Sequence, residues 1–125
     1  MRCLIVDDNA GFLAAARKLL EGAGITVVGT TSSSSEAIEL ATQLRPDVTL
    51  VDIDLGTESG IDLVGRLHLA GTWSVILMSA HSADDFLDPI ASSGALGFVA
   101  KSELSAAAIQ QVLGGSAGVQ EGDHR

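Results

Sequence analysis

The chain has 125 residues, enough for one domain with a core of its own. Its formal net charge is −9, from 16 acidic and 7 basic residues, and this argues against a nucleic-acid surface, which needs a basic face. The single cysteine, Cys3, has no partner for an intrachain disulfide, and no apolar run approaches the ~18 residues of a membrane span. We therefore expect a cytoplasmic protein without membrane contact.

Five short apolar runs alternate with stretches of helical spacing along the sequence. The first run ends on Asp7 and Asp8, and Asn9 is placed to cap the helix that follows. Ser33, with Glu36 three residues later, has the capping-box pattern that opens a second helix. The expected strands are 3–6, 25–29, 48–52, 74–78 and 96–100, and the expected helices are 10–21, 33–44, 61–67, 82–90 and 103–113.

This alternation predicts a parallel sheet covered by helices on both faces and joined by right-handed crossovers. We expect an α/β, flavodoxin-like (βα)5 fold, a doubly wound five-stranded sheet of order 2-1-3-4-5. Pro89 indicates that the fourth helix is short, kinked or mobile. Gly114 and Gly115 are expected to end the fifth helix, so we assign the domain to residues 1–114 and a flexible tail to 115–125.

Polar residues stand at the ends of four expected strands: Asp7 and Asp8, Asp52, Ser79 and Lys101. In open α/β sheets, ligands bind beyond the carboxyl ends of the strands, where the strand order reverses. Carboxylates gathered there repel one another by roughly 4 kcal/mol a pair at 4 Å and an effective dielectric of 20, so we expect a cation among them. Oxygen ligands favour Mg²⁺ or Mn²⁺ over Zn²⁺, and Mg²⁺ readily takes a phosphoryl oxygen as a further ligand.

The pattern resembles the receiver domain of bacterial response regulators over residues 2–114. The resemblance extends over all five strands and is more specific than any one motif. It rests on the acidic pair after the first strand, Asp52 after the third, Gly60 closing the next loop, Ser79 and Ala80 after the fourth strand, and Phe98 three residues before Lys101.

The resemblance implies a phosphoacceptor in a two-component or phosphorelay system, with Asp52 as the residue that takes the phosphoryl group. Asp8 and Asp52 would bind Mg²⁺ (or Mn²⁺) directly, with the backbone carbonyl of Asp54 as third protein ligand. Asp7 would hold a metal-bound water, and Lys101 would pair with a phosphoryl oxygen. The chain would be no enzyme beyond its own phosphorylation and dephosphorylation.

The same resemblance implies a switch, because phosphorylation turns one carboxylate into a group of roughly −2 charge. Ser79 and Lys101 would both bind the phosphoryl group, and the loop after the fourth strand would move inward. Phe98 would then rotate and repack the face of helix 4, strand 5 and helix 5, although an ordinary core role for Phe98 stays open. The expected partners are a histidine kinase or phosphotransfer protein and an unknown downstream protein, and a phosphorylation-dependent homodimer is compatible with this.

The sequence departs from the family pattern at several positions. Ser102 follows Lys101 where the family usually has proline, which favours a trans peptide bond after the lysine. Gly56 replaces a common proline and predicts a looser loop. Asp54 and His81 occupy positions that tune the lifetime of the phosphoryl group in this family.

Other residue types are expected to lie away from the chemistry. Trp73 precedes the fourth strand, at the edge opposite Asp52, and should report metal binding poorly. His68 and His124 are expected to face solvent.

Two alternative functions stay open at this point. Asp52 and Asp54 resemble the Asp-x-Asp nucleophile motif of haloacid-dehalogenase-type phosphatases, and a binding-only pseudo-receiver would dock a partner without phosphorylation. Residues 58–63 and the glycine pair after the last helix look similar to receivers that carry a helix-turn-helix output domain. Because few residues follow Gly114, we expect a stand-alone receiver.

Overall fold

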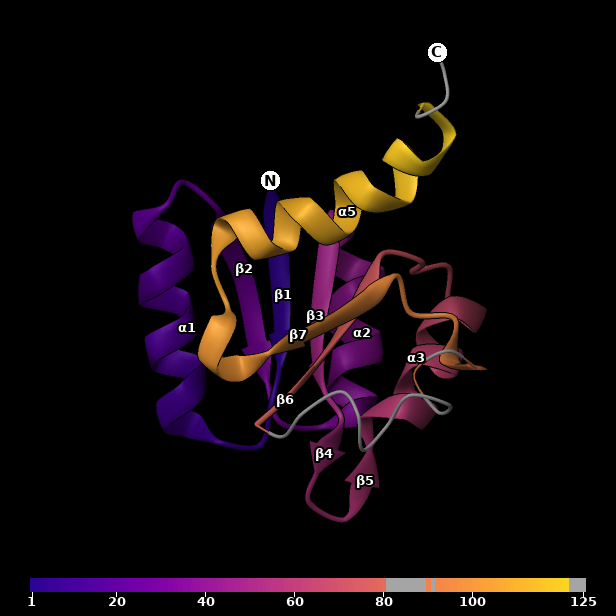
Figure 1. The fold of residues 1–125 in the computed structure, drawn as a ribbon. Helices are drawn as coiled ribbons and strands as arrows, with labels where there is room; N and C mark the ends of the chain where they lie inside the picture. Colours follow the sequence, from indigo (N-terminus) through magenta and orange to yellow (C-terminus); the bar gives the residue numbers. More distant parts are fainter. Residues whose placement is uncertain (81–89, 91, 122–125) are drawn as a thin grey trace.

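The computed structural model describes residues 1–80, 90 and 92–121. Five parallel strands form a sheet of order β2-β1-β3-β6-β7, which confirms the predicted 2-1-3-4-5 topology (Figure 1). The strands are β1 (Arg2–Val6), β2 (Thr26–Thr31), β3 (Val48–Asp52), β6 (Val75–Ser79) and β7 (Gly97–Ala100), and the helices are α1 (Ala10–Gly22), α2 (Ser34–Leu44), α3 (Gly60–Leu69) and α5 (Ala106–Glu121). The expected fourth helix, with Pro89, lies almost wholly outside the described residues.

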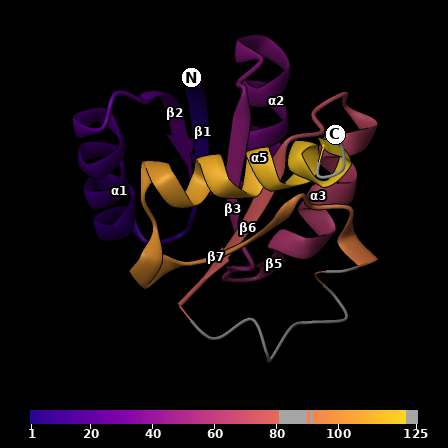
Figure 2. The same cartoon turned by 45° about the horizontal axis from the view of Figure 1, so that its top comes forward.

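Helices cover both faces of the sheet, with α5 across one face and α2 and α3 against the other (Figures 1 and 2). Successive strand residues point to opposite faces, so the central strands are apolar throughout. In β1, Cys3 and Ile5 join the core under α1 and α5, while Leu4 and Val6 join the core under α2 and α3. Cys3 is fully buried, and burial raises the pKa of its thiol to about 12.

Two helices begin where the sequence places their caps. The Asn9 side chain accepts a hydrogen bond from the Phe12 N–H at 2.9 Å, and Ser33 Oγ accepts from the Glu36 N–H at 3.2 Å. The predicted capping box is only half formed, because the Glu36 carboxylate accepts from the Thr31 hydroxyl instead of reaching back to the Ser33 N–H. Thr31 Oγ1 accepts from that N–H at 3.1 Å. No helix in the described part of the chain has the length and apolarity to cross a bilayer.

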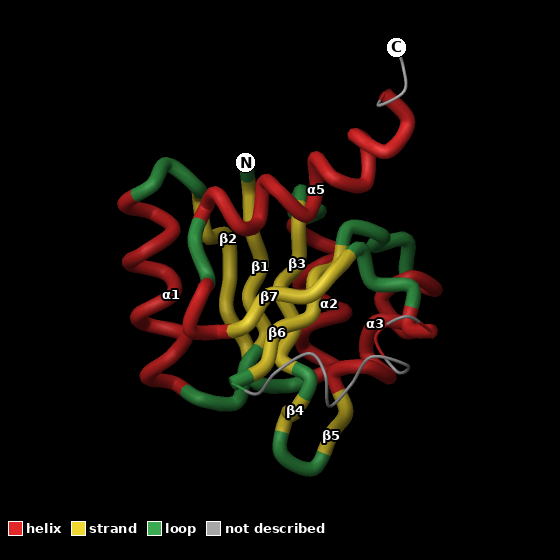
Figure 3. The backbone as a smooth tube through the Cα atoms, viewed as in Figure 1, coloured by secondary structure: helices red, strands yellow, loops and turns green. Residues whose placement is uncertain are grey.

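The structure differs from the expected elements in two places. A small antiparallel hairpin, β4 (Asp54–Leu55) with β5 (Glu58–Ser59), replaces the expected polar loop after β3 (Figure 3). Arms of two residues are too short to give a periodic signal in the sequence. The last helix starts at Ala106, later than expected, and continues past Gly114. It continues there because a glycine costs a helix only about 1 kcal/mol, which is too little to end it.

Candidate functional site

Three carboxylates meet at the carboxyl edge of the sheet. The parallel register pairs Val6 with Val51, so Asp7 and Asp52 follow at matching positions on neighbouring strands. Asp7 and Asp52 are buried and Asp8 is exposed, and one carboxylate oxygen from each lies within 4.8 Å of the others. The predicted convergence of acidic side chains is therefore present in the fold.

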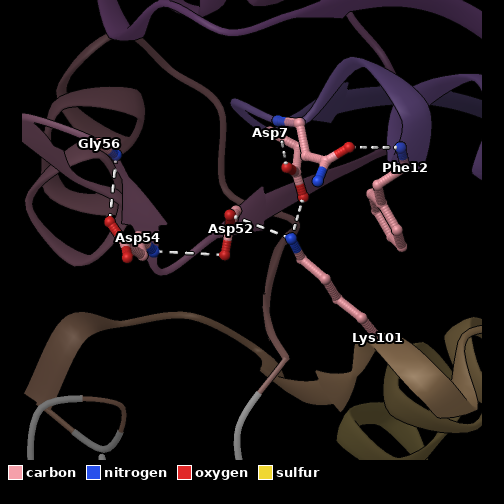
Figure 4. Close-up of polar contacts among 7 residues, drawn as sticks. Asp7, Phe12, Asp52, Asp54, Gly56 and Lys101 are labelled. Carbon is pink, nitrogen blue, oxygen red and sulfur yellow. Dashed lines mark hydrogen bonds and ion pairs between the residues drawn. The ribbon is translucent and has the colours of Figure 1, made fainter.

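Lys101, which follows β7, reaches into this acidic group (Figure 4). Its Nζ lies 2.6 Å from Asp7 Oδ2 and 3.2 Å from Asp52 Oδ2. Burial lowers the pKa of the lysine, but its hydrogen bonds to Asp7 and Asp52 outweigh this and raise the pKa above its ordinary value. The ammonium is therefore charged at neutral pH and compensates one of the three carboxylates.

The Asp52 carboxyl has a raised pKa. Burial is the largest cause and the negative charge of Asp7 is the second, and together they outweigh the hydrogen bond and charge of Lys101. The Asp54 N–H also donates to Asp52 Oδ1 at 3.3 Å, a long contact that lowers the pKa only slightly. Because the folded-state pKa exceeds the ordinary value of 3.8, the contribution of Asp52 to stability falls as the pH rises through that pKa.

The donor set fits a small divalent cation. Asp7 Oδ1 accepts from the Asn9 N–H at 2.9 Å, and the buried Asp7 Oδ2 has the Lys101 ammonium 2.6 Å away. Among the described residues, one ammonium faces the three carboxylates, and the candidate ligand atoms are all oxygens. Such a set is suited to Mg²⁺ or Mn²⁺.

Two glycines shape the loop beside the carboxylates. A Cβ added to Gly60 would lie 1.9 Å from the Asp52 carbonyl oxygen, so only glycine allows the loop to close there. The Gly60 N–H donates to the Ile53 carbonyl at 2.8 Å. Gly56 has φ +77° and its added Cβ would stand 3.5 Å from Asp8 Oδ2. Gly60 thus lets the loop close on the backbone of Asp52, and Gly56 adds no side chain beside the Asp8 carboxylate.

The remaining predicted residues are placed as follows. Ser79 is buried at the end of β6, one residue beyond the Met78 that pairs with Asp52. Phe98 is half-buried in β7 and packs against the core under α2 and α3, which leaves both of its proposed roles open. The peptide bond after Lys101 is trans, so the structure has no strained cis bond before the serine at position 102. His81 and His124 lie outside the described residues.

Phe12, on the inward face of α1 by helical spacing, contacts the site in a way that the sequence pattern does not predict. The Lys101 ammonium lies 4.6 Å from the centroid of the Phe12 ring, the geometry of a cation–π contact. The ring is half-buried, and Phe12 is in the first turn of α1, which begins at Ala10 soon after the acidic pair. Helical spacing signals only that Phe12 faces inward, and nothing in the pattern marks which residue it would meet there.

The expectation for His68 was wrong. Its ring is half-buried and stacks on Trp73 with centroids 4.5 Å apart, because the α3 end brings the two side chains together. Trp73 itself is exposed at the edge opposite the carboxylates, where the sequence places it.

The fold and site define a response-regulator receiver, and the chain belongs to that family: the response regulator receiver domain matches residues 3–113. Receivers of this family act in two-component signalling. A candidate transcriptional regulator of Pseudomonas aeruginosa is 34% identical over 103 residues, which are 82% of this chain and 50% of that protein. The alginate biosynthesis regulatory protein AlgB of the same species is 32% identical over 80% of this chain and 22% of AlgB. The chain therefore spans half or less of the length of these relatives.

Solved structures give the same result. A LuxR-family two-component response regulator from Aurantimonas superposes with a TM-score of 0.80 and 27% identity, over 94% of this chain and 85% of that chain. A response regulator from Burkholderia pseudomallei, solved with a phosphorylated aspartic acid and a calcium ion, has a TM-score of 0.81 at 22% identity, over 98% of this chain and 72% of that chain. The second likeness shows the shared fold.

Proposed function

We propose that the chain is a phosphoacceptor that takes a phosphoryl group on Asp52 from a histidine kinase or phosphotransfer protein. The carrying observation is the position of Asp52: a buried carboxylate beside Asp7 and Asp8, with the Lys101 ammonium 3.2 Å from its Oδ2. A protein of the same fold was solved with a phosphorylated aspartic acid and a bound divalent ion, which supports this chemistry. The downstream partner would be a protein that recognises the α5 and β7 face.

Asp52 would act as the nucleophile. A carboxylate oxygen attacks phosphorus as the bond to the donor's leaving group breaks, and the donor keeps that electron pair. Lys101 would turn from Asp7 toward a phosphoryl oxygen, and the Ser79 hydroxyl would donate to another. Asp8, Asp52 and the Asp54 carbonyl would hold Mg²⁺, with Asp7 binding one of its waters. When bound, Mg²⁺ would neutralise charge on the phosphoryl oxygens.

Incubation with acetyl phosphate tests this function directly. With Mg²⁺ present, intact mass should show one phosphoryl group per chain, and a chelator or Asp52→Asn should remove it. Glu39→Gln, which alters an exposed carboxylate of α2, should leave the addition unchanged. Absence of the group from the wild type would favour a binding-only pseudo-receiver, and its persistence in Asp52→Asn would rule out this nucleophile.

The phosphatase alternative is less consistent with the geometry. Asp54 Oδ1 accepts a hydrogen bond from the Gly56 N–H at 3.1 Å, so the carboxylate that would have to act as acid is engaged within its own loop. Continuous turnover of a phosphate ester, lost in Asp54→Asn with Lys101 dispensable, would reverse this judgement.

Phe12→Leu should slow phosphorylation by about threefold to fivefold. Leucine keeps apolar volume in α1 but removes the ring face under the Lys101 ammonium, a contact that contributes roughly 0.5–1 kcal/mol or more. The rate with acetyl phosphate measures the effect, and Phe12→Tyr, which keeps the ring, should restore it. An equal loss of rate in the tyrosine and leucine variants would show that Phe12 acts through packing alone.

A further inference from the structure

A hollow of about 500 Å³ lies at the edge of the sheet opposite Asp52, between the end of α2 and the turn that joins α3 to β6. Figure 2 brings this edge of the molecule forward. The volume of the hollow falls within the range of ordinary small-ligand sites. The hollow is lined by Ala41, Thr42, Arg45, Pro46, Ala70, Gly71, Thr72, Trp73 and Ser74.

Arg45 is the one charged residue in this lining, in a chain whose net charge is −9. It stands at the α2 C-cap with φ +48°, a left-handed conformation that favours glycine or asparagine. The final carbonyls of α2 are already satisfied by Arg2, whose Nη1 donates to Leu44 O at 2.6 Å and Arg45 O at 2.9 Å. Within the part of the chain that the structure describes, the Arg45 guanidinium has neither ion pair nor hydrogen bond.

Trp73 supplies the apolar part of the hollow. It is the chain's only tryptophan and is 65% exposed, while one face of its ring is held by the His68 stack. Its orientation is therefore fixed by protein contacts, and much of the indole still meets solvent. An aromatic surface and an unpaired guanidinium in the lining of one hollow suit a ligand with an apolar ring and a carboxylate.

We propose that this hollow binds a small aromatic carboxylic acid, with its carboxylate on Arg45 and its ring against Trp73. The site is separate from the phosphoacceptor, so it does not depend on the proposed function of Asp52. The guanidinium can take both carboxylate oxygens at once, which sets the direction of the ligand. The positive charge of Arg45 favours a carboxylate over an amine of the same size.

Fluorescence of Trp73 provides the test, because no other tryptophan contributes to the signal. Titrating the full chain with phenylacetate should give a saturable change, while phenylethylamine, of similar size and opposite charge, should give none. Amide shifts should change at residues 41–46 and 70–74. Equal responses to the acid and the amine, or none to either, would overturn the proposal.

Arg45→Gly separates binding from folding. Glycine suits the left-handed φ, so the variant should be at least as stable as the wild type, yet its affinity for phenylacetate should fall at least tenfold. Arg45→Lys should keep part of the affinity, and Arg66→Ala, at an exposed arginine outside the lining, should keep all of it. Unchanged affinity in Arg45→Gly would remove the assigned role of the guanidinium.

Discussion

Asp52→Asn is expected to make the metal-free folded chain more stable at neutral pH, although it removes the phosphoacceptor. The raised pKa of Asp52 means that its ionised form is less favourable in the folded than in the unfolded chain, through burial and the charge of Asp7. Asparagine keeps the shape without that charge. We expect a gain of about 1 kcal/mol, since the lost contact to Lys101 offsets part of the relief.

Urea unfolding at several pH values measures this effect. The advantage of Asp52→Asn should shrink as the pH falls through the raised pKa, because the wild-type carboxyl then takes up a proton. Added Mg²⁺ should reverse the order, since a ligand that binds only the folded wild type stabilises it by mass action. A variant that is less stable than the wild type at neutral pH without metal would contradict the account of the carboxylate cluster.

Gly60→Ala is expected to cost about 2–4 kcal/mol of stability, the largest effect on folding that we predict. The new methyl group would lie 1.9 Å from the Asp52 carbonyl oxygen and 2.8 Å from its carbonyl carbon. These are backbone atoms that cannot rotate away, so β3 or the start of α3 would have to shift. The Asp52 carbonyl lies just before the loop that would bind metal. We therefore expect Gly60→Ala to lower the Mg²⁺ affinity as well as the folding stability.

Gly65→Ala is the matched control for this substitution. Gly65 lies in the same helix, and an added Cβ meets nothing within 4 Å. Alanine is favoured over glycine in a helix by up to about 1 kcal/mol, so this variant should be as stable as the wild type or more so. Similar urea midpoints for Gly60→Ala and Gly65→Ala would show that the backbone moves away from the new methyl group at position 60 without loss of stability.

The fold could be predicted because the three central strands, β1, β3 and β6, are short, largely apolar and buried on both faces. Val48–Asp52 was placed at its observed bounds for that reason. The hairpin after it could not be, since Asp54–Leu55 and Glu58–Ser59 form through backbone pairing that leaves no pattern in two-residue arms. The prediction that α5 ends at Gly114 was wrong, because a glycine inside a run of helix-favouring residues is only a weak sign of a helix end.

The candidate site likewise has residues that the sequence could predict and contacts that it could not. Asp7, Asp8, Asp52 and Lys101 stand at strand ends, and topology alone brings strand ends together. Side-chain contacts across elements leave no such trace. The ring of Phe12 beneath the lysine depends on the depth and rotation of α1, which only packing decides.

The buried thiol of Cys3 can serve as a chemical probe of how often the core of this chain becomes exposed. It lies near the start of β1 with no exposed surface, and its pKa of about 12 leaves almost none of it as thiolate at neutral pH. An alkylating reagent can reach it only when the packing of α1 and α5 over β1 opens. The speed of that reaction therefore measures how often this core opens, and a tightly bound ligand at either edge of the sheet would slow the openings that also disrupt its own site.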